Sequence, residues 1–124
     1  MLFRSFARRY DRATALWGAA VVVDSRTNTI GASPSLAVDA SGRAVAAWMQ
    51  SDGVANSAWA SVYDPATNTW GAATLLETAA GAVTTPVAAV NAAGQAAVVW
   101  VQNDGTVNSL YAARYSGEIG RAHV

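Results

Sequence analysis

The chain has 124 residues, a formal net charge of zero and no cysteine. A chain of this length forms at most one ordinary domain, and its charge balance gives no electrostatic basis for binding nucleic acid or an anionic membrane. The lack of cysteine excludes disulfides and thiolate metal sites and leaves the cellular compartment open. No apolar run approaches the ~20 residues of a spanning helix. We therefore expect neither nucleic acid nor a membrane span.

Large apolar side chains are scarce in this sequence. Hydrophobic residues make up 52% of the chain, but alanine alone is roughly a quarter of all residues. All eight basic residues are arginine, which is typical of a coding bias rather than of a binding patch. The five tryptophans and four tyrosines must therefore supply much of the core.

The sequence repeats itself with a period of about 52 to 53 residues, which is typical of solenoids, propellers and repeat arrays. Residues 10–20 return as residues 63–73, and both copies carry Tyr-Asp followed by Trp-Gly-Ala-Ala. Residues 34–57 return as residues 86–109 with Pro, Gly, Trp, Gln, Asp-Gly and Asn-Ser at matching positions. One residue is lost between Trp70 and Pro86, where the offset changes.

The first residues of the chain match the end of a repeat. Residues 5–10 align with residues 58–63 and 110–115. A signal peptide is the alternative, because arginines precede an apolar stretch, but Asp11 interrupts the charged region and no small-residue cleavage pattern follows. We therefore divide the chain into residues 1–10, the tail of a preceding repeat; residues 11–62, repeat one; and residues 63–117, repeat two and the start of the next.

The last seven residues, 118–124, depart from the repeat. After Tyr115 the chain should continue toward a Trp-Gly pair, but it reads Glu-Ile-Gly-Arg-Ala-His-Val instead. This segment resembles the translation of a sequencing adapter, and we expect it to be non-native; the alternative is a short, divergent tail. His123, the single histidine, lies within it.

Within each period the chain alternates strands with turns. An Asp or Asn first and a Gly fourth in residues 39–42 and 91–94 suit a type I turn. Turn residues recur every eight to twelve positions or so, which favours strands over the helices that alanine would otherwise support. The expected strands are residues 34–38, 43–50, 57–63 and 70–77 in one period, and residues 95–102 and 109–115 in the next.

Four short antiparallel strands per repeat predict an all-β fold made of β-propeller blades, about two blades' worth of a partial ring. Residues 63–70, Tyr-Asp-Pro-Ala-Thr-Asn-Thr-Trp, resemble the corresponding segment of kelch repeats, and the same turn followed by Trp resembles the Asp-box of bacterial neuraminidase repeats. The longer pattern across residues 5–117 is similar to repeats of secreted bacterial propellers of the sialidase superfamily. The resemblance implies an extracellular or cell-surface location.

The resemblance to sialidases implies three arginines, a Tyr–Glu pair and an acidic proton donor. Glu77 is the only glutamate outside the suspect tail. Arg43 and Gln95 occupy the same repeat position, and so do Arg26 and Thr78 or Ala79. No arginine triad and no tuned carboxylate pair can be assembled. We therefore expect no catalytic residue, no cofactor and no metal in this segment.

The aromatic residues fall into two groups. Four tryptophans recur at matched positions, which predicts structural packing residues: Trp17, Trp48, Trp70 and Trp100. Trp48 and Trp100 could alternatively form a glycan-stacking platform. Trp59 and Tyr111 differ between copies and are the candidate ligand-contacting aromatics.

Two Asp-Gly pairs, at residues 52–53 and 104–105, predict turns, although each could be half of a calcium loop.

The expected function is a non-catalytic propeller scaffold within a larger secreted or surface bacterial protein. Its partners would be the neighbouring blades of the same chain and a glycan or protein ligand bound by loops. The alternative is the propeller of a sialidase-like glycoside hydrolase whose catalytic residues lie in other blades.

Overall fold

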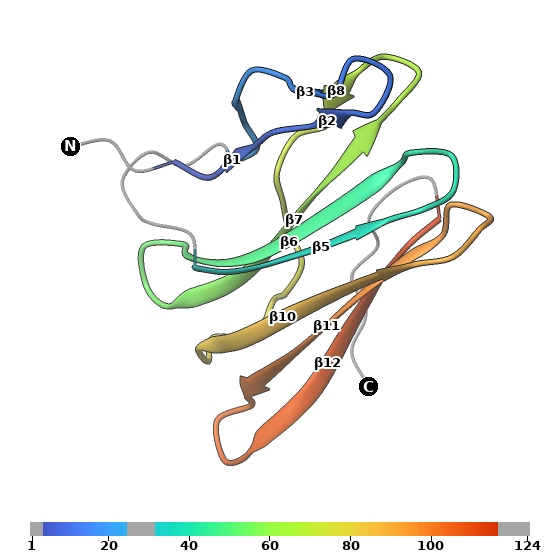
Figure 1. Ribbon diagram of the computed structural model, residues 1–124. Coiled ribbons are helices and arrows are strands. Elements are labelled where there is room, and N and C mark those ends of the chain that lie inside the picture. Colours follow the sequence, from blue (N-terminus) through green and yellow to red (C-terminus); the bar gives the residue numbers. More distant parts are fainter. Residues whose placement is uncertain (1–3, 25–31, 117–124) are drawn as a thin grey trace.

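The computed structural model describes residues 4–24 and 32–116, and these residues form β-strands and turns without a helix. Every strand pair is antiparallel. The strands form three layers, seen from top to bottom in Figure 1: the N-terminal hairpins, the first sheet and the second sheet. The prediction of an all-β fold with blade-like antiparallel sheets is confirmed, and none of the sheets closes on itself.

The N-terminal hairpins consist of four two-residue strands. In them β1 pairs with β4 and β2 pairs with β3. Their bounds are β1 (Phe6–Ala7), β2 (Tyr10–Asp11), β3 (Leu16–Trp17) and β4 (Val21–Val22).

The first sheet has the order β5-β6-β7-β8, and β9 also pairs with β7. Its strands are β5 (Ala32–Val38), β6 (Ala44–Ser51), β7 (Asn56–Asp64), β8 (Thr69–Trp70) and β9 (Thr74–Leu75). The boundary between the two sequence repeats, at residue 62, therefore falls inside β7. This sheet takes its strands from both sides of that boundary.

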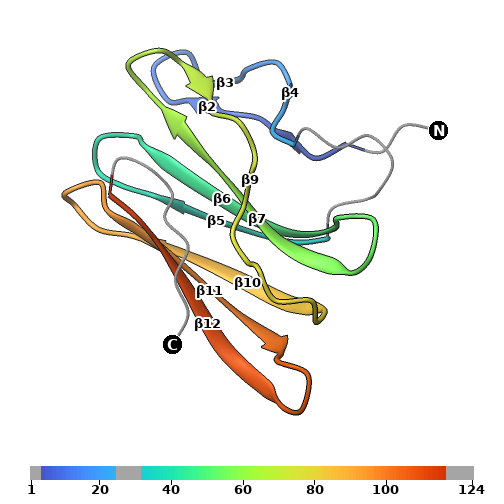
Figure 2. The same ribbon diagram turned by 180° about the vertical axis from the view of Figure 1, so that it is seen from behind.

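The single fourth strand expected over residues 70–77 is instead two short strands, β8 and β9. The interruption lies at Gly71, whose amide donates to the carbonyl of Val62 at 2.8 Å. The Ser61 hydroxyl donates to the Gly71 carbonyl at 2.8 Å. Glycine and alanine are depleted in strands, and the regular ladder stops at residues 71–73 and resumes at Thr74. Figure 2 shows β9 next to β7, with which it pairs.

The second sheet has the order β10-β11-β12. Its strands are β10 (Val83–Val90), β11 (Ala96–Asn103) and β12 (Asn108–Tyr115). Their pairing reproduces the first sheet: Trp48 lies opposite Trp59, and Trp100 lies opposite Tyr111 at the same position of the next repeat. The pairing register of the strands therefore repeats with the same period as the sequence.

Irregular backbone also recurs at matching positions. The pairing of the first strand shifts between Ala32 and Ser35, and again between Thr84 and Val87. The residue before each proline has a positive φ, 50° at Ser33 and 47° at Thr85. Such backbone is uncommon for residues other than glycine, so its recurrence shows that the two repeats share local conformation as well as strand order.

The N-terminal hairpins match the β7–β9 part of the first sheet. The rings of Tyr10 and Trp17 lie 5.4 Å apart with a tilt of 57°, and those of Tyr63 and Trp70 lie 5.5 Å apart with a tilt of 53°. A positive φ occurs in both turns, at Ala15 and Asn68. The described residues preceding β5 therefore have the geometry of the last part of a repeat.

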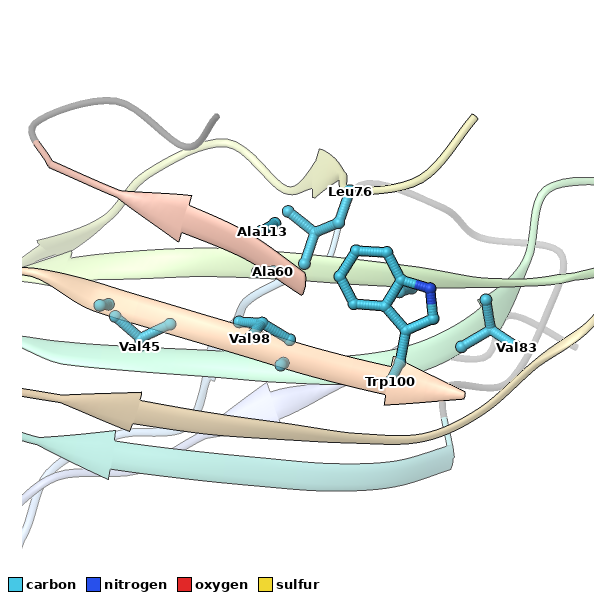
Figure 3. Close-up of a cluster of buried hydrophobic side chains, with 10 residues drawn as sticks. Val45, Ala60, Leu76, Val83, Val98, Trp100 and Ala113 are labelled. Carbon is cyan, nitrogen blue, oxygen red and sulfur yellow. The ribbon is translucent and has the colours of Figure 1, made fainter. Parts of the chain in front are cut away.

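The main core lies between the first and second sheets (Figure 3). Trp100 is its largest side chain and is 1% exposed. Small residues make up most of the rest, which allows the sheets to approach closely, and the amide of Ala88 donates to the Ser35 hydroxyl across the gap at 2.9 Å. The buried members are Val45, Ala47, Ala58, Ala60, Leu76, Val83, Ala96, Val98, Trp100 and Ala113.

Candidate functional site

The repeated Trp-x-Gln segment forms the same buried hydrogen bond in both repeats. The indole N–H of Trp48 donates to Gln50 Oε1 at 3.0 Å, and that of Trp100 donates to Gln102 Oε1 at 3.1 Å. All four side chains are 2% exposed or less. The two tryptophans that could have formed a glycan-stacking platform therefore lie in the interior, with their polar atoms satisfied there.

Gln102 also fixes the connection between β9 and β10. Its Nε2 donates to Glu77 Oε2 at 3.0 Å and to the carbonyls of Ala79 at 2.9 Å and Gly81 at 2.6 Å. Glu77 is 6% exposed. Sequence analysis placed Glu77 in no structural role, because the pairing joins residues 25 positions apart.

The position of Glu77 has a counterpart in the preceding repeat. Asp24 occupies it, is 7% exposed, and accepts a hydrogen bond from the Ser5 amide at 2.5 Å through Oδ2. An acidic residue therefore recurs at this buried position. The alignment of residues 24 and 77 was the sequence feature that could have indicated this recurrence.

The two candidate ligand-contacting aromatics lie on equivalent strands in different surroundings. Trp59 is 8% exposed, and its indole N–H donates to the carbonyl of Gln50 at 3.0 Å. Tyr111 is half-buried against the main core, with its ring stacked on Trp100 at 6.1 Å. A role for Trp59 and Tyr111 in ligand contact stays a prediction.

The remaining pair of recurring tryptophans differs in exposure. Trp17 is 61% exposed, whereas Trp70 is half-buried. The ring of each packs at a tilt against a tyrosine across a hairpin. Trp17 is therefore among the described side chains that offer the largest apolar surface to solvent.

An arginine joins the N-terminal hairpins to the first sheet. The Arg9 guanidinium lies 5.8 Å from the centre of the Tyr63 ring, and its Nη1 donates to the Tyr63 hydroxyl at 3.1 Å. The same nitrogen lies 3.4 Å from Asn68 Oδ1, which also accepts from the Tyr63 hydroxyl at 2.5 Å. Sequence analysis did not single out Arg9. Its recurrence as Arg114, one residue before a tyrosine in each case, was the available sign.

The Asp-Gly pairs form turns whose carboxylates bind their own backbone. Asp52 Oδ1 accepts from the amides of Val54 and Ala55 at 2.8 and 3.0 Å. Asp104 Oδ1 accepts from the amides of Thr106 and Val107, both at 2.9 Å. Within residues 4–24 and 32–116, no group of three or more His, Cys, Asp or Glu side chains is placed to hold a metal ion.

Hydrogen bonding makes the Asp104 carboxylate more acidic. The amides of Val107 and Thr106, followed by the hydroxyls of Thr106 and Ser109, hold the pKa of Asp104 well below its usual range. Asp39 shows the same effect, because the hydroxyl and amide of Ser41 and the amide of Arg43 lower its pKa.

The lowered pKa of Asp104 predicts a pH dependence of the β11–β12 turn. Since the folded pKa lies below the unfolded value of ~3.9, the contribution of the carboxylate is fully present above about pH 4 and is lost as the pH falls through the folded pKa. We expect Asp104→Asn to accelerate amide exchange at Val107 near pH 6, and this effect to shrink progressively below about pH 4. Hydrogen exchange of both proteins across this range is the measurement; an effect independent of pH would contradict the prediction.

The gap between the two sheets is too small to bind an organic ligand. A cavity of about 10 Å³ lies there, lined by Val45, Ala60, Val98 and Ala113 among others, and it has room for about one water molecule. Among the described residues, the side-chain contacts that recur from repeat to repeat, such as the Trp–Gln hydrogen bonds, lie where one layer packs on the next.

Comparison with protein-family models, with curated proteins and with solved structures finds no match for this chain. Within the described parts of the sequence, no helix has the length and apolar character that crossing a membrane requires.

Proposed function

We propose that this chain is a segment of a β-propeller that serves as a non-catalytic scaffold in a larger secreted or surface bacterial protein. The observation that carries the proposal is that equivalent residues of successive sheets face the same way. They are buried where the preceding layer covers them and exposed where it does not. Ala88 and Val90 of β10 lie partly buried against the main core. Leu36 and Val38, at the same positions of β5, are 63% and 57% exposed, because among the described residues before β5 no strand lies over them.

The proposed ligand is a glycan or a protein, bound by turns at one end of the sheets. Turns at the two ends differ in sequence between repeats while the strands keep their register, as in 52–55 and 104–107. Scaffolds of this kind vary their turns and hold their strands fixed. The hydrolase alternative gains no specific support from the described residues, because the Glu77 carboxylate is buried and accepts a hydrogen bond from Gln102.

A long sequencing read across the source gene, past the codon for Gly117, tests the repeat proposal. We expect the reading frame to continue with a further Trp-Gly repeat. Codons for residues 118–124 followed by a stop in the genome would contradict it. A glycan array with the full chain and with Val107→Ala, a substitution in the exposed β11–β12 turn, then tests the ligand; binding that Val107→Ala abolishes would assign the contact to that turn.

The uncovered layers predict the behaviour of the isolated chain. Repeat proteins normally cap their terminal sheets, and exposed sheet faces and edges favour association. We expect residues 1–124 alone to aggregate or to unfold over a broad, non-cooperative transition in differential scanning calorimetry. A soluble monomer with a sharp two-state transition would be incompatible with the fragment interpretation.

A further inference from the structure

The second sheet exposes a face that the first sheet buries. In β6 and β7 of the first sheet, Val45, Ala47, Ala58 and Ala60 are at most 1% exposed because the second sheet covers them. Strand alternation and the shared register place their counterparts on the side of the second sheet that is turned away from the first. These counterparts are Ala97, Val99, Leu110 and Ala112. Together with their cross-strand neighbours Val87, Val101 and Arg114 they form what we call the outer face.

The outer face is apolar and accessible. Leu110 is 56% exposed, Val87 is 49% exposed and Val101 is 37% exposed. The residue at the position of Leu110 in the first sheet is Ala58, which is fully buried. The same position is thus covered in one layer and open in the next.

A second apolar surface lies at the opposite end of the stack, on the N-terminal hairpins. Phe6 and Trp17 are each 61% exposed, Tyr10 is 48% exposed and Val22 is 38% exposed. Phe6 pairs with Val22, and Tyr10 pairs with Trp17. Phe6 and Tyr10 hold the repeat positions of Trp59 and Tyr63, which share one face of β7. We call Phe6, Tyr10, Trp17 and Val22 the aromatic patch.

Internal packing shows how these two surfaces fit each other. Tyr111 and Tyr115 of the second sheet occupy the repeat positions of Phe6 and Tyr10, and both pack against the core of small residues that the first sheet presents. Ala60 and Val62 of that core occupy the repeat positions of Ala112 and Arg114. In this stack, therefore, aromatic positions of one layer lie on small positions of the layer before it.

An arginine–tyrosine contact specifies the same arrangement. Arg9 of the N-terminal hairpins lies over the ring of Tyr63 in the next layer. Arg114 has the repeat position of Arg9 and is exposed on the outer face, and Tyr10 has the repeat position of Tyr63 and is exposed on the aromatic patch. The arginine of this contact is thus exposed at one end of the stack, and the tyrosine is exposed at the other end.

We propose that a second copy of this chain binds head to tail, with its aromatic patch on the outer face and with Arg114 of one copy over Tyr10 of the next. The interface is heterologous, so each bound copy still presents one free face, and assembly continues into a ring or an open filament. The proposal rests on the repeat packing of the proposed function and goes beyond it: in the isolated chain of 124 residues, a second copy takes the place that a neighbouring repeat has in the proposed scaffold.

The test uses one variant on each surface. Leu110→Arg places a charge in the outer face, and Trp17→Arg places one in the aromatic patch. Each should weaken self-association about tenfold or more, because an unpaired charge is desolvated at the centre of the contact. Val54→Arg is the matched control, since Val54 is 91% exposed in the β6–β7 turn and lies on neither surface.

Light scattering after size exclusion, over a wide concentration range, gives the readout. We expect the wild type and Val54→Arg to form concentration-dependent oligomers, and Leu110→Arg and Trp17→Arg to be monomers with unchanged circular dichroism. An equimolar mixture of the two monomeric variants should form a dimer and nothing larger, because it contains one intact head and one intact tail.

Three results would overturn the proposal. A monomeric wild type would show that the outer face and the aromatic patch do not bind each other. Self-association of Trp17→Arg alone would indicate a symmetric tail-to-tail contact. Oligomers that persist in both variants, or a mixture that does not stop at the dimer, would indicate non-specific aggregation.

Discussion

Trp100→Ala is expected to destabilise the packing of the two sheets by about 3–5 kcal/mol, the usual cost of removing a buried tryptophan. The side chain is 1% exposed and lies at the centre of the main core, and its ring stacks on Tyr111. Since 1.4 kcal/mol corresponds to tenfold, amides of β11 and β12 should lose protection from hydrogen exchange by about a hundredfold or more.

Trp17→Ala is the matched control, measured at low protein concentration. Trp17 is 61% exposed and contacts Tyr10 across a hairpin. We expect its removal to change protection in the second sheet by less than about tenfold. Equal effects of the two substitutions would contradict the assignment of Trp100 to the main core.

Gln102→Leu is expected to cost about 3 kcal/mol or more, although it replaces a polar side chain with an apolar one of similar size. It removes the acceptor of the Trp100 indole and the donor to Glu77, and leaves both groups buried without those partners. The carbonyls of Ala79 and Gly81 lose their donor as well. Amides of β10 and β11 should lose protection from hydrogen exchange by about a hundredfold or more.

Gln95→Leu provides the comparison, because Gln95 is exposed and its side chain accepts only from the Asn91 side chain at the surface. We expect a change of at most about 0.5 kcal/mol. If Gln102→Leu proved equally mild, the network around Glu77 would contribute little to stability.

Strand positions could be predicted from this sequence because each is bounded by local turn chemistry. The segment expected at residues 43–50 is β6 at Ala44–Ser51, and the one expected at residues 109–115 is β12 at Asn108–Tyr115. Asp39 and Asn91 illustrate why: each side chain accepts from the amides two and four residues later, so the turn is encoded within five residues.

Contacts between layers could not be predicted in the same way. The burial of Glu77 depends on Gln102, and the position of Arg9 depends on Tyr63, which lies 54 residues away. At the interruption of the fourth strand, the Ser61 hydroxyl donates to a backbone carbonyl ten residues away. Strand periodicity reports which residues are apolar but not which face of another sheet they meet.

The matching register of successive layers has a consequence for how such a chain changes length over evolution. Each layer has one surface that packs on the preceding layer and a complementary surface that packs on the following layer. The contact of Arg9 with Tyr63 is an example. An in-frame duplication of one whole period therefore inserts a layer that already fits both neighbours. A duplication of part of a period would break this match, because a one-residue slip turns every side chain of a strand to the opposite face. Growth by whole units is thus the step that the geometry tolerates without compensating substitutions.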